Sequence, residues 1–243
     1  MWRIERVDET GSTNDDITPR LGAAEAGLVL VTDLQTAGRG RRAGRSWVAP
    51  RGSGLLFTAA LPRPIAPHAL WCVTFWASLA IRDAVRRTCG VAPSLIWPND
   101  LLIEGRKVCG ILCVSRIEGE RAWIAVGSGL NVHRPRDGGA LAEISPPPAF
   151  LSDLDPGADR GRLLDAILGA YAARLAELDD PHGVARRWER EAGLDGTPYQ
   201  VVPDGETAPR SVIARRISYP GSLVVEQDGV ERTVTLADVR LLR

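Results

Sequence analysis

The chain has 243 residues, of which 44% are hydrophobic and 25% are charged, and its 30 basic residues balance 30 acidic ones. This length allows one large domain, or a large domain with a small one. The zero net charge argues against a general polyanion binder, because such proteins depend on many uncompensated cations. No apolar run approaches the ~20 residues of a membrane span, and the N-terminus has no apolar signal core. We therefore predict a cytoplasmic protein without a membrane partner.

The first ninety positions alternate between short strands and two helical segments. Ser12 has the character of an N-cap, and Pro19 should keep the helix that follows short or irregular. A long amphipathic helix is predicted to begin at Pro67 and to end near Gly90. Apolar β patterns predict strands at 2–7, 28–32 and 54–61.

From residue 94 the pattern returns to β-structure and then to helices. Strands are predicted at 94–97, 101–103, 108–115 and 123–132. After a Pro/Gly-rich loop over 133–149, helices are predicted near 159–179 and 183–192. This order of elements predicts an α+β fold, in which a mixed or antiparallel sheet has its helices packed on one side.

The C-terminal part has a different sequence pattern, in which turn residues separate four short apolar runs. The runs are 199–202, 211–217, 223–227 and 231–235, and the turns are Asp204-Gly205, Pro220-Gly221 and Asp228-Gly229. Asp-Gly between alternating runs is a strong hairpin signal. We predict a small SH3-like β-barrel domain at 196–243. It should pack on a larger domain, residues 1–195, because so small a unit is marginally stable alone.

A loop from Gln35 to Trp47 places four arginines within seven positions, and it also contains three glycines. Glycine lets backbone N–H groups approach a ligand, and clustered arginines recognise phosphate or carboxylate. The spacing fits neither a Walker A loop nor a dinucleotide fingerprint. We predict an anion site that becomes ordered when its ligand binds. The alternatives are a solvated loop, or an RNA-binding loop, which the zero net charge disfavours.

Lys107 is the only lysine, since 29 of the 30 basic side chains are arginine. Its ammonium is a compact point charge, able to follow charge that builds up on one oxygen atom. The Glu104-Gly105 turn folds Lys107 back beside Asn99 and Asp100, and the base of a hairpin is a rigid platform. The alternatives are a chance surface lysine and, for Asn99-Asp100, a simple turn.

Two further polar segments are weaker signals by themselves. Gly127 and Gly129 lie within a predicted strand, which indicates a bulge or a close approach to the backbone. Asn131 follows them and offers both a donor and an acceptor, as a purine edge would require. Ser12-Thr13-Asn14 is explained on its own by a helix cap.

Taken together and in this order, these segments resemble those of biotin protein ligases (biotin–[acetyl-CoA-carboxylase] ligases). The matching pieces are Ser12-Thr13-Asn14, Gln35 with GRGR at 38–41, Trp47, WPND at 97–100, RKxxGIL at 106–112 and GxGxN at 127–131. The resemblance extends over essentially the whole chain, although the arginine loop is one residue longer than its common form. No DNA-binding helix-turn-helix segment precedes the first strand, so we expect a monofunctional enzyme that does not bind DNA.

The resemblance implies that biotin is adenylated with MgATP to biotinyl-5′-AMP and transferred to a lysine of a biotin carboxyl carrier protein domain. It implies catalytic roles for Lys107 and Arg41. The implied biotin-binding residues are Ser12, Thr13, Asn14, Gln35, Arg39, Gly40, Arg41 and Lys107. The implied ATP-binding residues are Arg39, Arg41, Asn99, Asp100, Lys107 and Asn131. The alternatives are a lipoate ligase, which performs the same adenylation on another acid, and a biotin sensor that transfers nothing.

Overall fold

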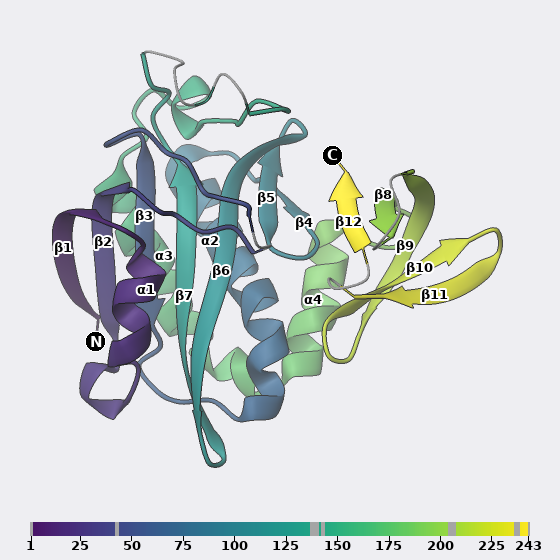
Figure 1. The fold of residues 1–243 in the computed structure, drawn as a ribbon, viewed down its shortest axis with the longest axis horizontal. Coiled ribbons are helices and arrows are strands. Elements are labelled where there is room, and N and C mark those ends of the chain that lie inside the picture. The colour runs from purple at the N-terminus through teal and green to yellow at the C-terminus, as the bar shows by residue number, and fades with distance from the viewer. Residues whose placement is uncertain are drawn as a thin grey trace.

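The computed structural model describes residues 2–41, 44–136, 141, 144–203, 208–235 and 239–242. The larger of its two sheets has seven strands in the order β1-β2-β3-β7-β6-β5-β4 (Figure 1). Only the β1–β2 pair is parallel within this sheet, which confirms the mixed α+β prediction. The strands are β1 (Arg3–Thr10), β2 (Leu28–Gln35), β3 (Gly54–Ala60), β4 (Ser94–Ile96), β5 (Asp100–Ile103), β6 (Arg106–Glu118) and β7 (Arg121–Asn131).

Three helices cover one face of this sheet and enclose the main core with it (Figure 1). The predicted 67–90 helix is a 3₁₀ segment followed by α2, which ends at Gly90 with a left-handed φ of 71°. Asp159 and Asp180 cap α3 and α4 by accepting backbone N–H groups. The three helices are α2 (Val73–Cys89), α3 (Arg160–Arg174) and α4 (Pro181–Ala192), and the 3₁₀ segments near them are η3 (Pro67–Cys72), η5 (Leu151–Asp153) and η6 (Leu175–Asp179). Within the described residues, no helix is long and apolar enough to span a bilayer.

The prediction that helices pack on one side only was wrong, because a short helix occupies the opposite face. It consists of α1 (Thr13–Ile17), with η1 (Thr18–Arg20) and η2 (Ala23–Glu25) after it. Successive side chains of a strand point to opposite faces, so Leu28 joins a second small core while Val29 joins the main one. Ile17 and Leu21 pack in that second core. The helix is short, as Pro19 predicted, because the chain turns into a 3₁₀ segment there.

The C-terminal strands form an open sheet in the order β11-β10-β9-β8-β12, so the prediction of a closed barrel was wrong. Among the described residues, the two outermost strands do not pair. Val201, Ala214 and Leu223 of this sheet belong to the main core, so its apolar face is covered by the larger sheet's helices rather than by itself. The strands are β8 (Pro198–Pro203), β9 (Arg210–Ser218), β10 (Ser222–Gln227), β11 (Val230–Val234) and β12 (Val239–Leu242).

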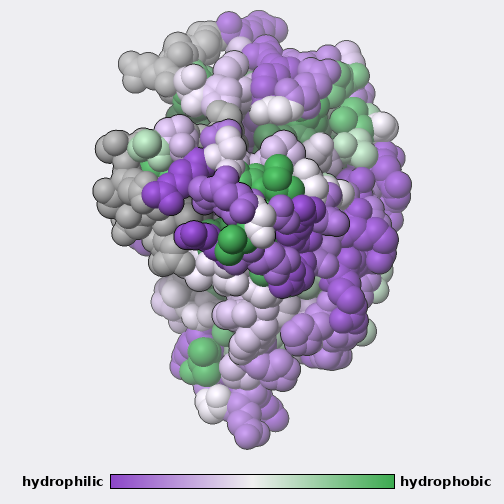
Figure 2. Space-filling model, turned by 90° about the vertical axis from the view of Figure 1, so that its right-hand side faces the viewer, coloured by the Kyte–Doolittle hydropathy of each residue, from purple (hydrophilic) through white to green (hydrophobic). Residues whose placement is uncertain are grey.

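Most of the C-terminal turns were predicted correctly. Asp228 and Gly229 both have positive φ and join β10 to β11, as expected for an Asp-Gly hairpin. The predicted Asp204-Gly205 turn lies outside the described residues, and the strand β12 was not predicted. The face of the molecule on this side is mainly hydrophilic, with small separate apolar spots (Figure 2).

Trp97 connects the two sheets. Its indole Nε1 donates to the carbonyl of Gly221, 3.0 Å away, and its backbone N–H donates to the hydroxyl of Tyr199. Both aromatic side chains are buried. The shared core and these bonds fix the C-terminal sheet against the rest of the chain, while the division into domains at 195/196 stays a prediction.

Replacing Tyr199 by Phe tests this junction. The ring is kept, but the buried N–H of Trp97 loses its acceptor, which should lower the free energy of unfolding by about 1–3 kcal/mol. Urea unfolding measures the change. Tyr219→Phe is the control, because Tyr219 is 62% exposed and should change stability by less than about 0.5 kcal/mol. Equal effects of the two variants would contradict the prediction.

Candidate functional site

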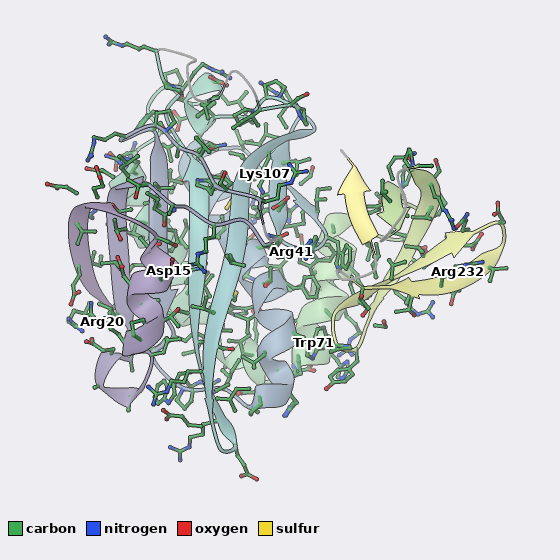
Figure 3. The ribbon with its side chains drawn as sticks, viewed as in Figure 1. Asp15, Arg20, Arg41, Trp71, Lys107 and Arg232 are labelled. Atoms are coloured by element: carbon green, nitrogen blue, oxygen red, sulfur yellow. The ribbon has the colours of Figure 1, made fainter. Side chains whose placement is uncertain are left out.

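A pocket opens between the loop that follows β2 and the strands β6 and β7. It lies on the face of the large sheet that also carries α1, the helix drawn in front of the sheet in Figure 1. The β6 and β7 strands form its floor, and Figure 3 shows Arg41 next to β6, the strand that carries Lys107. Its lining comes from five separate segments of the chain: Ser12, Thr13, Asn14, Gln35, Arg39, Gly40, Arg41, Trp47, Asn99, Lys107, Gly110, Ile111, Leu112, Gly127, Ser128 and Gly129.

Glycines make the floor of this pocket possible. A Cβ on Gly127 would lie 2.2 Å from Oδ1 of Asn14, and a Cβ on Gly129 would lie 2.4 Å from the Trp47 ring. At Gly110 a Cβ would meet both that ring and the Lys107 amine at 3.0 Å. The β6–β7 pairing runs through these positions without a bulge. The predicted alternatives of bulge or close approach are therefore resolved in favour of close approach.

One end of the pocket is neutral and polar. The amide oxygen of Gln35 accepts hydrogen bonds from the backbone N–H and the hydroxyl of Thr13, at 2.8 and 3.0 Å. Asn14 donates to the carbonyl of Leu112, and the buried Thr58 hydroxyl lies 2.8 Å from both Thr13 Oγ1 and Asn14 Oδ1. This network fixes the side chains before any ligand arrives, because each oxygen already has a partner.

The other end of the pocket is cationic. Lys107 Nζ lies 2.8 Å from Oδ1 of Asp100 and 5.3 Å from the centre of the Trp47 ring. Asp100 is only 2% exposed, so its carboxylate reaches the ammonium from inside the protein. Asn131 donates to the backbone carbonyl of Lys107 and helps to fix the hairpin. The ammonium is therefore held from below and presents its remaining donors to the pocket.

Burial lowers the pKa of Lys107 to about 8, and the nearby positive charges of Arg41 and Arg45 act in the same direction. Cys109 opposes this lowering of the Lys107 pKa, less strongly than burial causes it but more strongly than either arginine adds to it. The Asp100 carboxylate also opposes the shift, because an anion at 2.8 Å favours the charged amine. With a pKa of about 8, the Lys107 amine is only partly protonated at slightly alkaline pH. A second anion in the pocket would increase the protonated fraction.

The arginine loop folds as a narrow hairpin over this pocket. The N–H of Trp47 donates to the carbonyl of Gly38, and that of Gly40 donates to the carbonyl of Arg45. Arg39 forms an ion pair with Asp15 on α1, at 2.8 Å. Residues 42–43 at the tip, including the arginine at position 42, lie outside the described part of the chain.

The structure brings together most of the site residues that were predicted from the sequence. All of them line the pocket except Asp100 and Asn131, which lie behind its wall and contact Lys107 instead. Asn99 lines the pocket, and its amide N–H₂ donates to the carbonyl of Ile111. The lining residues that were not nominated individually all lie in motifs that were recognised: Trp47, Gly110, Ile111, Leu112, Gly127, Ser128 and Gly129. Thr58 gave no signal, because a threonine in an apolar strand is ordinary.

Comparison with known proteins places this chain in one family. The sequence model of the Biotin/lipoate A/B protein ligase family matches residues 4–131. A biotin–[acetyl-CoA-carboxylase] ligase of Mycobacterium tuberculosis is 32% identical, over 100% of this chain and 90% of its own length. One of Paracoccus denitrificans is also 32% identical, over 97% and 98%. The chain therefore belongs to the biotin/lipoate A/B protein ligase family.

A solved structure shares the fold along its whole length. The biotin protein ligase of Aquifex aeolicus, in complex with biotin and ATP, superposes with a TM-score of 0.77. The alignment covers 99% of this chain and 98% of that one at 22% identity. At this identity the likeness establishes the fold, including the C-terminal sheet.

The glycine floor generates a stability prediction. In Gly127→Ala the new Cβ meets Asn14, whose side chain cannot move without breaking buried hydrogen bonds, so unfolding should be easier by about 1–3 kcal/mol. Chemical denaturation followed by circular dichroism measures this. Gly169→Ala in α3 is the control, because nothing lies within 4 Å of its Cβ position and alanine favours a helix. A destabilisation of both variants would argue against the steric explanation.

Proposed function

We propose that this protein is an ATP-dependent, carbon–nitrogen bond-forming ligase that converts biotin to biotinyl-5′-AMP and transfers biotin to a lysine of a biotin carboxyl carrier domain. One observation carries the proposal. A single pocket changes from buried neutral hydrogen-bonding groups at one end to arginine and lysine at the other. Biotin has the matching order, with a neutral ureido ring, a slim apolar middle and a carboxylate. A cytoplasmic location, where ATP is available, is part of the proposal.

The neutral end suits a ureido group better than a purely apolar ring. Ser12, Thr13 and Gln35 offer hydroxyl and amide groups that can both donate and accept. An apolar dithiolane ring in the same space would offer no partner to the Ser12 hydroxyl or to the amide nitrogen of Gln35, which is costly in a buried site. The side-chain-free floor at Gly127 and Gly129 leaves a flat slot for a fused bicyclic ring.

The first chemical step joins two anions. A carboxylate oxygen of biotin attacks the α-phosphorus of ATP, the bond from that phosphorus to the bridging oxygen breaks, and pyrophosphate leaves. Bringing these anions into contact is unfavourable unless cations are already in place. In this proposal Lys107 bridges the carboxylate and the α-phosphate, and Arg39 and Arg41 neutralise the phosphate oxygens. Preorganised groups of this kind are commonly worth about 10²–10³ in rate each.

Asp100 has a positioning role in this scheme rather than a place on the nucleotide. It holds the Lys107 ammonium at 2.8 Å from inside the hairpin and keeps it charged. Asn131 acts on the same residue through its backbone carbonyl. Asn99 remains at the pocket wall, available to the nucleotide end. The hairpin would thus act as one rigid unit that aims a single amine.

In the second step the neutral amine of the carrier lysine attacks the carbonyl carbon of the mixed anhydride. The bond from that carbon to the phosphate oxygen breaks, AMP leaves, and the new amide nitrogen loses a proton. The arginine hairpin over the pocket would exclude water, which otherwise hydrolyses the anhydride. Mg²⁺ would enter as part of MgATP. Among the described residues, no three His, Cys, Asp or Glu side chains lie together as a group that could hold a metal ion.

Lipoate is the competing substrate, because the family includes enzymes for both acids. Exchange of labelled pyrophosphate into ATP, tested with each acid in turn, decides between them. Biotin-dependent exchange is expected, and exchange with lipoate alone would overturn the proposal. Labelling of a carrier domain in the presence of biotin and MgATP then distinguishes a ligase from a biotin sensor.

Replacing Lys107 tests the proposed chemistry. Lys107→Ala should reduce biotin-dependent exchange by about 10²–10³. Lys107→Arg should also lose most activity, because a wide planar fork cannot take the place of a compact ammonium held by Asp100. Arg106→Ala is the matched control, since Arg106 is adjacent but does not line the pocket. Normal exchange by Lys107→Ala would remove this residue from the mechanism.

The pH dependence of the first step follows from the lowered pKa of Lys107. The charged form is lost as pH rises through about 8, so kcat/KM for biotin in the exchange reaction should fall above that pH. The carboxylate and phosphates stay ionised there, since their pKa values lie near 4 and 6. In Asp100→Asn the amine loses an anion that keeps it charged, so the fall should move to lower pH. An unchanged profile in Asp100→Asn would contradict the positioning role of Asp100.

A further inference from the structure

We propose that Asp15 is a positioning residue of this active site, which holds Arg39 and the arginine hairpin over the pocket and so slows the escape of the bound adenylate. The inference rests on the proposed function. Asp15 belongs to α1, does not line the pocket, and was not among the site residues predicted from the sequence. Figure 3 shows Asp15 on α1, in front of the sheet.

Helix α1 contacts the arginine hairpin through an ion pair. Asp15 Oδ2 lies 2.8 Å from Nη2 of Arg39, and Arg39 is itself part of the pocket lining. Asp15 is the third residue of α1, whose first residue, Thr13, also lines the pocket. The same short helix therefore supplies a group to the neutral end of the pocket and an anchor for its cationic cover.

The base of the hairpin is held in a different way. The N–H of Ala37 donates to the carbonyl of Gly11, and Gln35 accepts from Thr13, both at 2.8 Å. These bonds involve neutral groups next to the sheet, and no part of a ligand needs to break them. Beyond this base, the Arg39–Asp15 ion pair ties the part of the loop that covers the pocket to α1.

Electrostatics makes this tie sensitive to its surroundings. Arg39, Arg41 and Arg45 lie on one narrow hairpin near the Lys107 ammonium, and like charges so close repel each other. The Asp15 carboxylate offsets part of that repulsion. The side chains of Arg39 and Asp15 are 63% and 42% exposed, so the pair is weak and is screened by salt.

A guanidinium has five N–H donors in a planar fork, so one edge can stay on Asp15 while another binds an anion in the pocket. Arg39 would then connect the bound adenylate to α1. Loss of the Asp15 carboxylate should leave the role of Lys107 in adenylation unchanged, but it should let the arginine hairpin move away from the pocket more often. The reactive anhydride would escape into water more often before a carrier lysine arrives.

Asp15→Asn tests the proposal, with Asp16→Asn as its matched control. Asp16 lies in the same turn and loses the same charge, but its carboxylate accepts from Thr10 rather than from Arg39. Labelled biotinyl adenylate is formed on the enzyme without a carrier, and its release is followed after a chase. Release from Asp15→Asn should be about two- to fivefold faster than from the wild type and from Asp16→Asn at low ionic strength. The difference should shrink at high salt, and Asp15→Glu should restore slow release.

A second readout needs no ligand. In the free protein, hydrogen exchange of the Gly40 and Trp47 amides should be faster in Asp15→Asn than in Asp16→Asn, while urea unfolding of both variants stays close to that of the wild type. Equal release and equal exchange in the two variants, or failure of Asp15→Glu to restore them, would overturn the inference. A wild type that makes no adenylate would instead overturn the proposed function, and the exchange measurement would still report on the Asp15–Arg39 contact.

Discussion

The site depends on one steric constraint, the absence of side chains at Gly110, Gly127 and Gly129 on one face of β6 and β7. Because those positions carry no Cβ, the Asn14 side chain and the Trp47 ring can lie directly on the strand backbones. The opposite face of the same strands is ordinary core, with Ile111, Val126 and Leu130 packed under the helices. One pair of strands therefore stabilises the domain with one face and opens a slot with the other.

The Lys107–Asp100 pair shows how a hairpin can aim a charge. A fully buried carboxylate needs a partner, and a partly buried ammonium loses solvation, so each group stabilises the other in a place that water reaches poorly. Their strands are connected by a tight turn, in which Glu104 and Gly105 have positive φ. The pair is thus set by local geometry and needs no movement of distant elements to form.

The sequence predicted those features that depend on local chemistry. The close approach at the glycines of β7, the short first helix at Pro19, the helix end at Gly90 and the Asp228-Gly229 turn depend on chemistry within a few residues, and these predictions are confirmed. Ser12 occupies the N-cap position of α1 as predicted, but its side chain makes no cap hydrogen bond. The sequence did not predict which face a short helix would cover, because Ile17 and Leu21 can pack on either side of a sheet. It also could not show that Asp100 lies behind the pocket. An aspartate at this position of the sequence is equally compatible with an exposed turn and with a buried ion pair to Lys107. The open C-terminal sheet depends on contacts with α4 and with Trp97, and Trp97 lies far from Tyr199 and Gly221 along the chain.

Two kinds of contact hold the two ends of the pocket, and the difference suits the proposed reaction. The neutral end rests on buried bonds among Thr13, Asn14 and Thr58, which salt and pH leave unchanged. The cationic end relies on charges whose strength depends on what else is bound, including the exposed Asp15–Arg39 pair. A rigid neutral end can select the acid, while an adjustable cationic end can admit MgATP, hold the adenylate and then open to the carrier lysine. An enzyme that must retain its intermediate between two reactions needs this division, because a site rigid at both ends would hold its product as firmly as its intermediate.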